Sequence, residues 1–334
     1  MRLVQIAKGQ ERRVGLIDGE QVRLLDPQRG RDVYSLAMEA IKKGMTLSSV
    51  VENTMGNEVV DYPQLYQGTS PWKLLPSFDY PNEPARCVVS GTGLTHKASA
   101  ENRAAMHKKS GAEMTDSTRM YRMGLDAGRP VEGEIGVQPE WFYKGNGSIL
   151  RAHGETLTIP PYSWDGGEEP EVAGAYVIAL DRSPCRVGLT MGNEFSDHRM
   201  EQRNYLYLAP SKLRNCSIGP ELIVGETEFQ NVPGTVAIRR DGNVLWSKEI
   251  WTGEKNMSHT VANLEHHHFK YEMHRRPGDA HVHFFGADAF SFGDGVELQQ
   301  GDVMEVAFAE FGKSLQNPLN IDKSVDGLVK VRAL

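Results

Sequence analysis

Beyond residue 85 the chain consists mainly of short apolar runs that end in turn residues, and this pattern restricts the fold more than any other feature. The runs include "RCVVSG", "AGAYVIAL", "CRVGLTMGN", "AHVHFFG" and "DVMEVAFAEFG". Short apolar runs bounded by such residues are typical of strands. Asp241-Gly242, between "GTVAIRR" and "NVLWSKEIW", predicts a hairpin turn. We therefore predict a mostly β domain of barrel-like or roll-like type over residues 86–334.

The first 85 residues have a different character. "RLVQIA" and "RRVGLIDGEQVRLL" predict two or three small strands, with a hairpin turn at Asp18-Gly19. "DVYSLAMEAIKKG" has apolar residues at helical spacing and predicts a short amphipathic helix that stops at Gly44. Residues 53–85 are proline-rich and predict a connector. The predicted fold class is α+β, with a small N-terminal α+β domain and connector over residues 1–85.

Two helical stretches interrupt the β-rich part. One, "THKASAENRAAMHKKSG", starts at Thr95, and the other, "SHTVANLEHHHFKYE", starts at Ser258. Within the second, consecutive histidines diverge by about 100° each around a helix, so His266–His268 cannot converge on one ion. We expect Val261, Leu264 and His268 to face inward.

His281 and His283 share one face of the predicted strand "AHVHFF". The sequence places no third ligand beside them, and a zinc site needs at least three protein ligands. We therefore expect a packed or hydrogen-bonded histidine pair rather than a metal site.

Charge and composition exclude several classes of function. The formal net charge is −7 and the basic residues are dispersed, so we expect no nucleic-acid partner and no membrane-surface partner. No stretch approaches the roughly 18 apolar residues of a spanning helix, and the N-terminus lacks the apolar centre of a signal peptide. We expect a cytoplasmic protein whose three cysteines, Cys87, Cys185 and Cys216, are reduced.

Two glutamates, Glu169 and Glu171, stand at the start of the apolar run in "GGEEPEVAGAYVIAL". On a strand both would point to one face, where like charges repel unless a cation or a shared proton lies between them. Glu194 ends another apolar run in "LTMGNEFSD". Three carboxylates without cysteine or histidine at matched spacing suit a hard divalent cation, with Mg²⁺ as the default and Mn²⁺ or Ca²⁺ as alternatives. The other interpretation is a set of solvated glutamates at strand edges.

Several further motifs resemble the metal-site core of the fumarylacetoacetate hydrolase superfamily in order and approximate spacing over residues 86–320. They are "VVSGTGLTHKASAENR", "QPEWFYKGNGSIL", the two glutamates before an apolar strand, "GNEFSD", "APSKLRNCSIGPELIVG" and "FGADAFSFGDGVELQQGDVMEVAFAEFGKSLQNPL". The resemblance implies a mixed β-roll with a metal in its open end, and a homodimer. It also implies Glu169, Glu171 and Glu194 as metal ligands, with Lys212 beside the metal.

The chain departs from the hydrolases of that superfamily where they carry a His-x-x-Glu pair that activates water. The position of that histidine falls on Ser99, with His96 three residues earlier and Glu101 two residues later. This departure, with "GLTH", "FYKGNG", "GNEFSDH" and "LEHHHF", resembles the sugar-acid branch of the superfamily. Relatives in that branch dehydrate 2-keto-3-deoxy pentonates.

The resemblance implies magnesium-dependent dehydration of a 2-keto-3-deoxy pentonate, an arabinonate or xylonate, to 2-oxoglutarate semialdehyde. We favour Glu140 as the proton acceptor over a solvated loop carboxylate. Lys212 is the second candidate, with a pKa expected to be depressed by the metal charge. Lys144 and Ser148 are the expected binders of the sugar hydroxyls.

Two alternative functions stay open. One is hydrolysis of a C–C bond in an acylpyruvate or 2,4-diketo acid, which uses the same metal. The other is a sugar-acid-binding protein without turnover.

Overall fold

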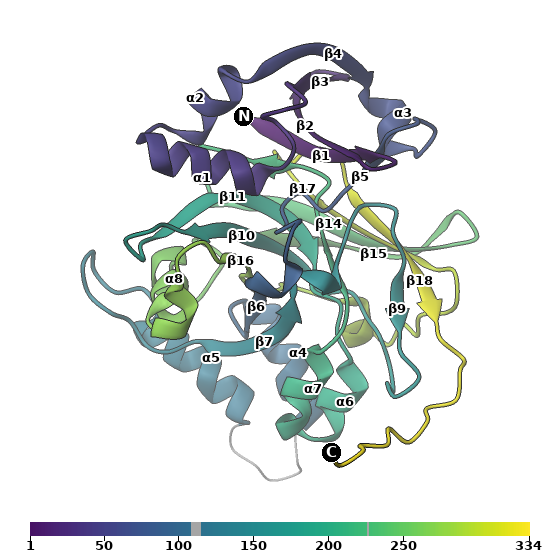
Figure 1. Ribbon diagram of the computed structural model, residues 1–334. Helices are drawn as coiled ribbons and strands as arrows, with labels where there is room; N and C mark the ends of the chain where they lie inside the picture. Colours follow the sequence, from purple (N-terminus) through teal and green to yellow (C-terminus); the bar gives the residue numbers. More distant parts are fainter. Residues whose placement is uncertain (108–114, 226) are drawn as a thin grey trace.

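The computed structural model describes residues 1–107, 115–225 and 227–334, and within them the chain folds around two sheets (Figure 1). The strands of the larger sheet are β1 (Arg2–Lys8), β2 (Glu11–Asp18), β3 (Gln21–Leu25), β4 (Met55–Asp61), β5 (Lys73–Leu74), β6 (Cys87–Gly93), β7 (Glu140–Asn146), β8 (Leu150–Arg151), β10 (Pro170–Ile178), β11 (Pro184–Asn193), β12 (Cys216–Ile218), β13 (Leu222–Ile223) and β16 (Ala280–Phe284). Those of the smaller sheet are β9 (Leu157–Ile159), β14 (Val232–Arg240), β15 (Asn243–Thr252), β17 (Val303–Phe308) and β18 (Leu315–Ile321).

Helices cover both ends of this β-structure (Figure 1). The α-helices are α1 (Val33–Lys43), α2 (Leu47–Glu52), α3 (Tyr62–Tyr66), α4 (Lys97–His107), α5 (Asp116–Ala127), α6 (His198–Arg203), α7 (Leu208–Lys212) and α8 (Val261–Phe269). The 3-10 turns are η1 (Pro84–Arg86), η2 (Gly147–Ile149), η3 (Tyr205–Tyr207), η4 (Glu272–Arg275) and η5 (Ser291–Asp294). Figure 1 shows α4–α7 gathered at the end of the molecule away from α1 and α2.

The central path of the larger sheet runs β4-β3-β2-β1-β13-β11-β10-β16-β6-β7. The β16–β6 pair is parallel and the β10–β11 pair is antiparallel, so the predicted mixed β-structure is confirmed. Strand β10 lies at the centre, and all of its residues are buried. Its carboxylate-bearing end therefore opens from the core of the molecule rather than from an exposed edge.

The N-terminal strands continue this sheet. β1 pairs antiparallel with β13, and Leu3 lies opposite Leu222. One core cluster likewise combines Leu36 of α1 with Ala173 of β10 and Val282 of β16. The sheet and the core thus both cross residue 85, and the division of the chain at that residue stays a prediction.

Local signals in the sequence correspond to observed elements. Gly44 ends α1 in the left-handed region, where the sequence predicts the stop, and Asp32 caps the start of the helix through its side chain. Asp241 and Gly242 both have positive φ and join β14 to β15, as a type I′ hairpin requires. The expected connector is only partly correct, because residues 53–85 contain β4 and α3. Most residues of β4 are exposed, and its sequence lacks the alternation of apolar and polar residues from which a strand is predicted.

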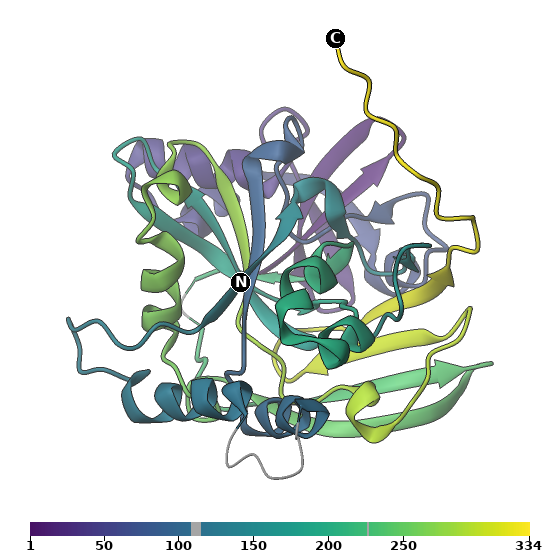
Figure 2. The ribbon, with the colours of Figure 1, turned by 90° about the horizontal axis from the view of Figure 1, so that it is seen from below.

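The remaining expectations on elements have mixed outcomes. α8 begins after the cap Thr260, and the end of the stretch predicted from Thr95 lies outside the described residues. The three cysteines are free. Among the residues that the structure places, no helix is both long and apolar enough to span a membrane. The segment after β18 is exposed and projects from the molecule (Figure 2).

The inward-facing histidines form a buried hydrogen-bonded cluster. The indole N–H of Trp141 can only donate, so Nδ1 of His268 accepts (3.2 Å) and Nε2–H of His268 donates to Nδ1 of His281 (3.0 Å). His283 instead contacts Ser90 through Nδ1 (2.9 Å) and stacks on His268. His281 and His283 are therefore each bonded to other residues and not to one another. Burial, with a smaller contribution from neighbouring histidines, lowers the pKa of each of these two to about 3.

This cluster predicts acid-sensitive stability. Between pH 6.5 and 4.5 the unfolded chain takes up a proton on His283, whereas the folded protein does not, so acid favours unfolding. We expect the free energy of unfolding of His283→Asn to fall less steeply with acid than that of wild type. The difference should reach up to about 1.4 kcal/mol per pH unit. Urea titrations at several pH values measure the two slopes, and equal slopes would contradict the assignment of a neutral buried histidine.

Candidate metal centre

The two expected glutamates stand at the start of β10. Glu169 directly precedes the strand and Glu171 is its second residue. Glu171 lies opposite Gly192 of β11, and Glu194 follows that strand, with its N–H donating to the carbonyl oxygen of Glu169 (2.9 Å). One carboxylate oxygen from each glutamate lies within 4.8 Å of the other two, and all three side chains are buried. The structure thus brings the three predicted ligands together, and we call them the carboxylate triad.

Two buried lysines contact the triad. Nζ of Lys212, at the end of α7, donates to Oε1 of Glu169 (2.8 Å) and to Oε2 of Glu194 (2.8 Å). Nζ of Lys144 on β7 lies 2.6 Å from Oε1 of Glu194. Glu171 receives only the N–H of Gly286 (2.7 Å) and has no ion pair within the described part of the chain. It is the member of the triad that lacks a counter-charge.

The pKa values of the triad follow from these contacts. Burial raises the pKa of Glu171 well above its usual range, and the nearby Glu194 and Glu169 add to the effect. Burial also raises the pKa of Glu194 to about 7, although Lys144 and Lys212 oppose it. The pKa of Glu169 is held well below its usual range, because Lys212 and the hydrogen bond with His198 outweigh the effect of burial. A cation near Glu171 would relieve the remaining repulsion.

The depression of the pKa of Lys212 is expected from the charge of a bound metal, and it stays a prediction. The protein's own groups act in the opposite direction. Burial favours the neutral amine, but the carboxylates of Glu169, Glu194 and Glu201 outweigh burial and raise the pKa well above its usual range. With these partners Lys212 is an ammonium that donates hydrogen bonds to the triad.

Glu140 belongs to the same buried region. It is the first residue of β7, and its Oε2 accepts from the hydroxyl of Tyr205 (2.8 Å). Burial raises the pKa of Glu140 despite the neighbouring guanidinium of Arg103. A Cβ at position 93 would overlap Oε1 of Glu140, so any other residue there would require the carboxylate to shift. The alternative of a solvated loop carboxylate is excluded by this burial.

Arg103 and Glu201 complete the region and were not anticipated from the sequence. Nη2 of Arg103 on α4 lies 2.8 Å from Oε2 of Glu201 on α6, and Nη1 lies 3.6 Å from Oε2 of Glu140. Oε1 of Glu201 lies 3.3 Å from Nζ of Lys212, which links these residues to the triad. Arg103 lies four residues after Ser99 and therefore on the same face of the helix, and this spacing is the sequence feature from which Arg103 could have been predicted.

The two expected hydroxyl binders have different locations. Lys144 is in the site but is bound to Glu194 and to the carbonyl oxygens of Phe195 (2.7 Å) and Lys212 (3.1 Å). Ser148 is exposed on η2 and donates to Oδ1 of Asn146 (2.7 Å). The structure therefore does not bring Ser148 to the buried triad.

Ser99, at the position of the histidine of the water-activating pair, and the nearby His96 and Glu101 do not contact the triad. His96 is buried and hydrogen-bonded to the hydroxyls of Thr95 (2.9 Å) and Thr252 (3.2 Å). Ser99 donates to the carbonyl oxygen of His96 (3.2 Å), and Glu101 is exposed. None of the three contacts the triad.

The donor set fits a hard divalent cation. All three groups of the triad offer carboxylate oxygens, which Mg²⁺, Mn²⁺ and Ca²⁺ prefer. Across the whole region the carboxyl groups of Glu140, Glu169, Glu171, Glu194 and Glu201 outnumber the lysine and arginine cations of Arg103, Lys144 and Lys212 by two. His198 adds a further positive charge when it is protonated, and Glu169 raises its pKa although burial opposes this. A cation would relieve the excess of negative charge that remains.

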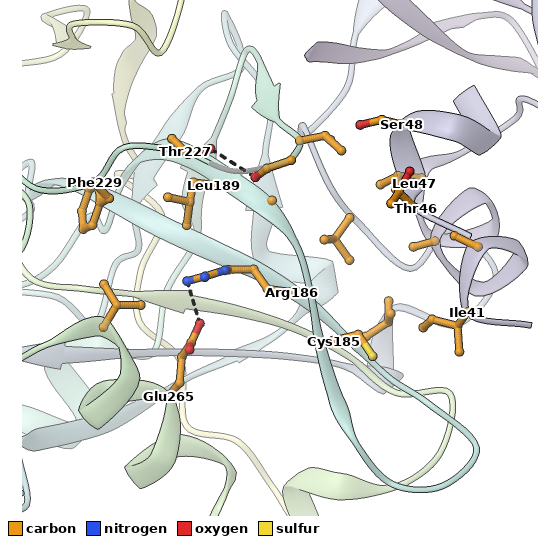
Figure 3. A pocket seen from close by; sticks show the side chains of 18 of the residues that line it. Ile41, Thr46, Leu47, Ser48, Cys185, Arg186, Leu189, Thr227, Phe229 and Glu265 are labelled. Carbon is orange, nitrogen blue, oxygen red and sulfur yellow. Dashed lines mark hydrogen bonds and ion pairs between the residues drawn. The ribbon is translucent and has the colours of Figure 1, made fainter. Parts of the chain in front are cut away.

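A separate cavity of about 900 Å³ lies between α1, α2, β11 and α8 (Figure 3). Its lining includes Ile41, Leu189 and Phe229, and Arg186 pairs there with Glu265 at 3.0 Å. It contains none of the triad or its partners. Size alone therefore does not identify the site, and the chemistry of the buried carboxylates does.

Comparison with known proteins gives the same fold. No protein-family model matches the chain. It is 34% identical over 122 residues to a probable 2-keto-3-deoxyxylonate dehydratase of Haloferax volcanii, and the match covers 35% of this chain and 40% of that protein. The chain thus spans less than half of that relative.

Solved structures extend the similarity along the chain. A 2-keto-3-deoxy-D-arabinonate dehydratase complexed with magnesium and 2,5-dioxopentanoate has a TM-score of 0.72 and 19% identity, covering 97% of this chain and all of that one. A 5-carboxymethyl-2-hydroxymuconate delta-isomerase from Mycobacterium smegmatis has a TM-score of 0.59 and 14% identity, with the same coverage. These similarities confirm the fold that the sequence motifs predict.

The uncompensated charge of Glu171 predicts the behaviour of Glu171→Gln. Without metal this variant should be at least as stable as wild type, because burial disfavours the ionised carboxyl of Glu171, which has no ion pair, and glutamine carries no charge at any pH. It should also lose the increase in melting temperature that Mg²⁺ or Mn²⁺ gives to chelator-treated wild type. Thermal melts with and without metal measure both effects.

Glu168→Gln is the matched control, because Glu168 is a buried carboxyl held by Ser291 outside the triad. It should keep the metal response. A full metal response in Glu171→Gln would argue against the triad as the metal site.

Proposed function

We propose that this protein is a magnesium-dependent hydro-lyase. It dehydrates a 2-keto-3-deoxy pentonate, the arabinonate or the xylonate, to 2-oxoglutarate semialdehyde. The observation that carries the proposal is a buried carboxylate triad beside a buried glutamate, Glu140, while Ser99 stands at the position of the histidine of the water-activating pair.

The compared proteins support this substrate class. The Haloferax volcanii relative is named for 2-keto-3-deoxyxylonate, and the similar solved structure is named for 2-keto-3-deoxy-D-arabinonate. The 2,5-dioxopentanoate in that complex is 2-oxoglutarate semialdehyde, the product of our proposed reaction. The magnesium in that complex supports Mg²⁺ as the ion of the triad here.

The residues of the site suit the chemistry of dehydration. When bound, the divalent cation supplies Lewis-acid polarisation of a 2-oxo acid, which acidifies the hydrogen on C3. Glu140 takes that proton, and its raised pKa brings it closer to a working pH near neutrality. The C3–H electrons form the C3–C4 double bond as the C4 hydroxyl leaves with the proton as water. The product of this step, 5-hydroxy-2-oxopent-3-enoate, loses a proton from C5 and gains one at C3, which gives an enol with a C4–C5 double bond. That enol tautomerises to the semialdehyde.

Lys212 has a different part in this proposal. As an ammonium between Glu169 and Glu194 it donates hydrogen bonds and holds those carboxylates in place. It fixes the geometry of the triad and does not remove the C3 proton.

The same geometry disfavours hydrolysis of an acylpyruvate. Hydrolysis needs a base for water, yet α4 presents Ser99 and Arg103 on its buried side. A guanidinium stays protonated and cannot serve as that base. His96 is buried and hydrogen-bonded elsewhere, and burial lowers its pKa to about 3.

Two further features belong to the proposal. We propose that the protein is a homodimer, on the basis of the resemblance, and that it acts in the cytoplasm. Light scattering on the purified protein tests the first.

The direct test of function is incubation with Mg²⁺ and each candidate substrate. We expect 2-keto-3-deoxy-arabinonate or 2-keto-3-deoxy-xylonate to lose one water and yield 2,5-dioxopentanoate, detected by mass spectrometry. Pyruvate from an acylpyruvate, without any semialdehyde from the sugar acids, would favour the hydrolase instead. Metal-dependent binding without product would favour a sugar-acid-binding protein.

The role of Glu140 gives a quantitative prediction. Glu140→Gln keeps the shape of the side chain but cannot accept the proton, so kcat should fall by about 10²–10⁴-fold. The response of the melting temperature to Mg²⁺ should stay as in wild type, because Glu140 is outside the triad. Glu132→Gln, at an exposed position, is the control and should leave kcat unchanged. A Glu140→Gln enzyme with near wild-type kcat would exclude Glu140 as the base.

A further inference from the structure

We propose that Arg103 and Glu140 form a subsite for the hydroxylated end of the substrate. This inference rests on the proposed function and names the group that selects a sugar acid over a plain 2-oxo acid. It also replaces the assignment of hydroxyl binding to Lys144 and Ser148.

Arg103 has buried N–H groups that donate no hydrogen bond to the described residues. Its side chain is 6% exposed, and Nη2 pairs with Oε2 of Glu201. Nε and Nη1 are buried and have no hydrogen-bond acceptor among the described residues. A buried guanidinium normally satisfies its N–H groups, so these two atoms point to a ligand that supplies an acceptor.

Glu140 has a buried carboxylate oxygen that accepts no hydrogen bond from the described residues. Its Oε2 accepts from Tyr205, whereas its Oε1 is buried and receives no hydrogen bond from the described residues. The carboxylate lies beside the guanidinium, with 3.6 Å between Oε2 of Glu140 and Nη1 of Arg103. Unused donors and an unused acceptor therefore belong to neighbouring buried side chains.

This combination selects the chemistry of the ligand. A hydroxyl can accept from the guanidinium and donate to the carboxylate. A second carboxylate or a phosphate offers acceptors only and would be repelled by Glu140. An apolar group would leave all three atoms unpaired. The subsite therefore suits an uncharged polyhydroxyl tail.

The subsite adjoins the metal centre through Glu201. That residue contacts Arg103 by one carboxylate oxygen and Lys212 by the other, and Lys212 contacts the triad. A 2-oxo acid with its carboxylate end at the triad would direct its hydroxylated end to Arg103 and Glu140.

The earlier candidates lack this capacity. An ammonium has three N–H groups. That of Lys144 already has three acceptors, which are the carboxylate of Glu194 and the carbonyl oxygens of Phe195 and Lys212. Ser148 is exposed. Arg103 has unused donors in the described structure, and they lie beside the unused Oε1 of Glu140.

The test uses two stable ligands that differ only in the hydroxylated tail. They are 2,4,5-trihydroxypentanoate and 2-hydroxypentanoate. Neither has the ketone that acidifies C3, so neither is dehydrated, and calorimetry in the presence of Mg²⁺ gives their dissociation constants. Wild type should bind the trihydroxy acid at least tenfold more tightly than the monohydroxy acid.

Arg103→Met should abolish that preference while changing the dissociation constant of 2-hydroxypentanoate by less than about threefold. Arg103→Lys, which keeps the charge but not the planar fork of donors, should retain only part of the preference. It also serves if the methionine variant does not fold. Arg13→Met is the matched control, because Arg13 is a buried arginine paired with Glu58 in the N-terminal sheet, and it should discriminate as wild type does.

Two results would overturn the subsite. One is a wild type that does not distinguish the two ligands. The other is an Arg103 variant that keeps the full preference or weakens both ligands equally, since equal weakening indicates a structural role. Because no turnover is measured, the subsite can stand even if no 2-keto-3-deoxy acid is dehydrated, and that result would contradict the proposed function alone.

Discussion

Repulsion between like charges in a buried space is the constraint on which the site depends. Glu169 and Glu171 project from the start of a strand that is buried along its whole length, and Glu194 meets them from the neighbouring strand. Solvent cannot screen these carboxylates as it screens surface charges. The charge of these carboxylates is therefore balanced by neighbouring side chains. Lys144 and Lys212 form ion pairs with Glu194 and Glu169, whereas Glu171 has no ion pair among the described residues.

Strand register converts this local arrangement into a requirement on the whole sheet. Side chains alternate between the faces of a strand, so a slip of one residue between β10 and β11 would turn Glu171 away from Glu194. The register is held by apolar residues in the core on both faces of β10, including Val172 and Ala173. The N-terminal strands extend the same sheet through β13. Residues far from the chemistry thus help to fix the distances within the triad.

The sequence was informative where the chemistry depends on short-range geometry. The spacing of Glu169 and Glu171 requires a shared face on any strand, and the Asp-Gly pairs require their turns. The sequence was uninformative where the position or charge of a residue depends on tertiary packing. The packing of α4 near α6 brings Arg103 and Glu201 together across nearly a hundred residues. The charge state of Lys212 depends on three carboxylates from separate segments, so it could not be derived from its own motif.

Gly93 has a consequence for how this protein tolerates change. It contributes no side chain, yet the carboxylate of Glu140 occupies the space that any Cβ at that position would need. In a library of variants selected for survival on a sugar acid, a substitution at position 93 would act through the position of the Glu140 carboxylate. A search for functional residues that considers only side chains would miss Gly93, because what position 93 contributes is the space left by the lack of a side chain.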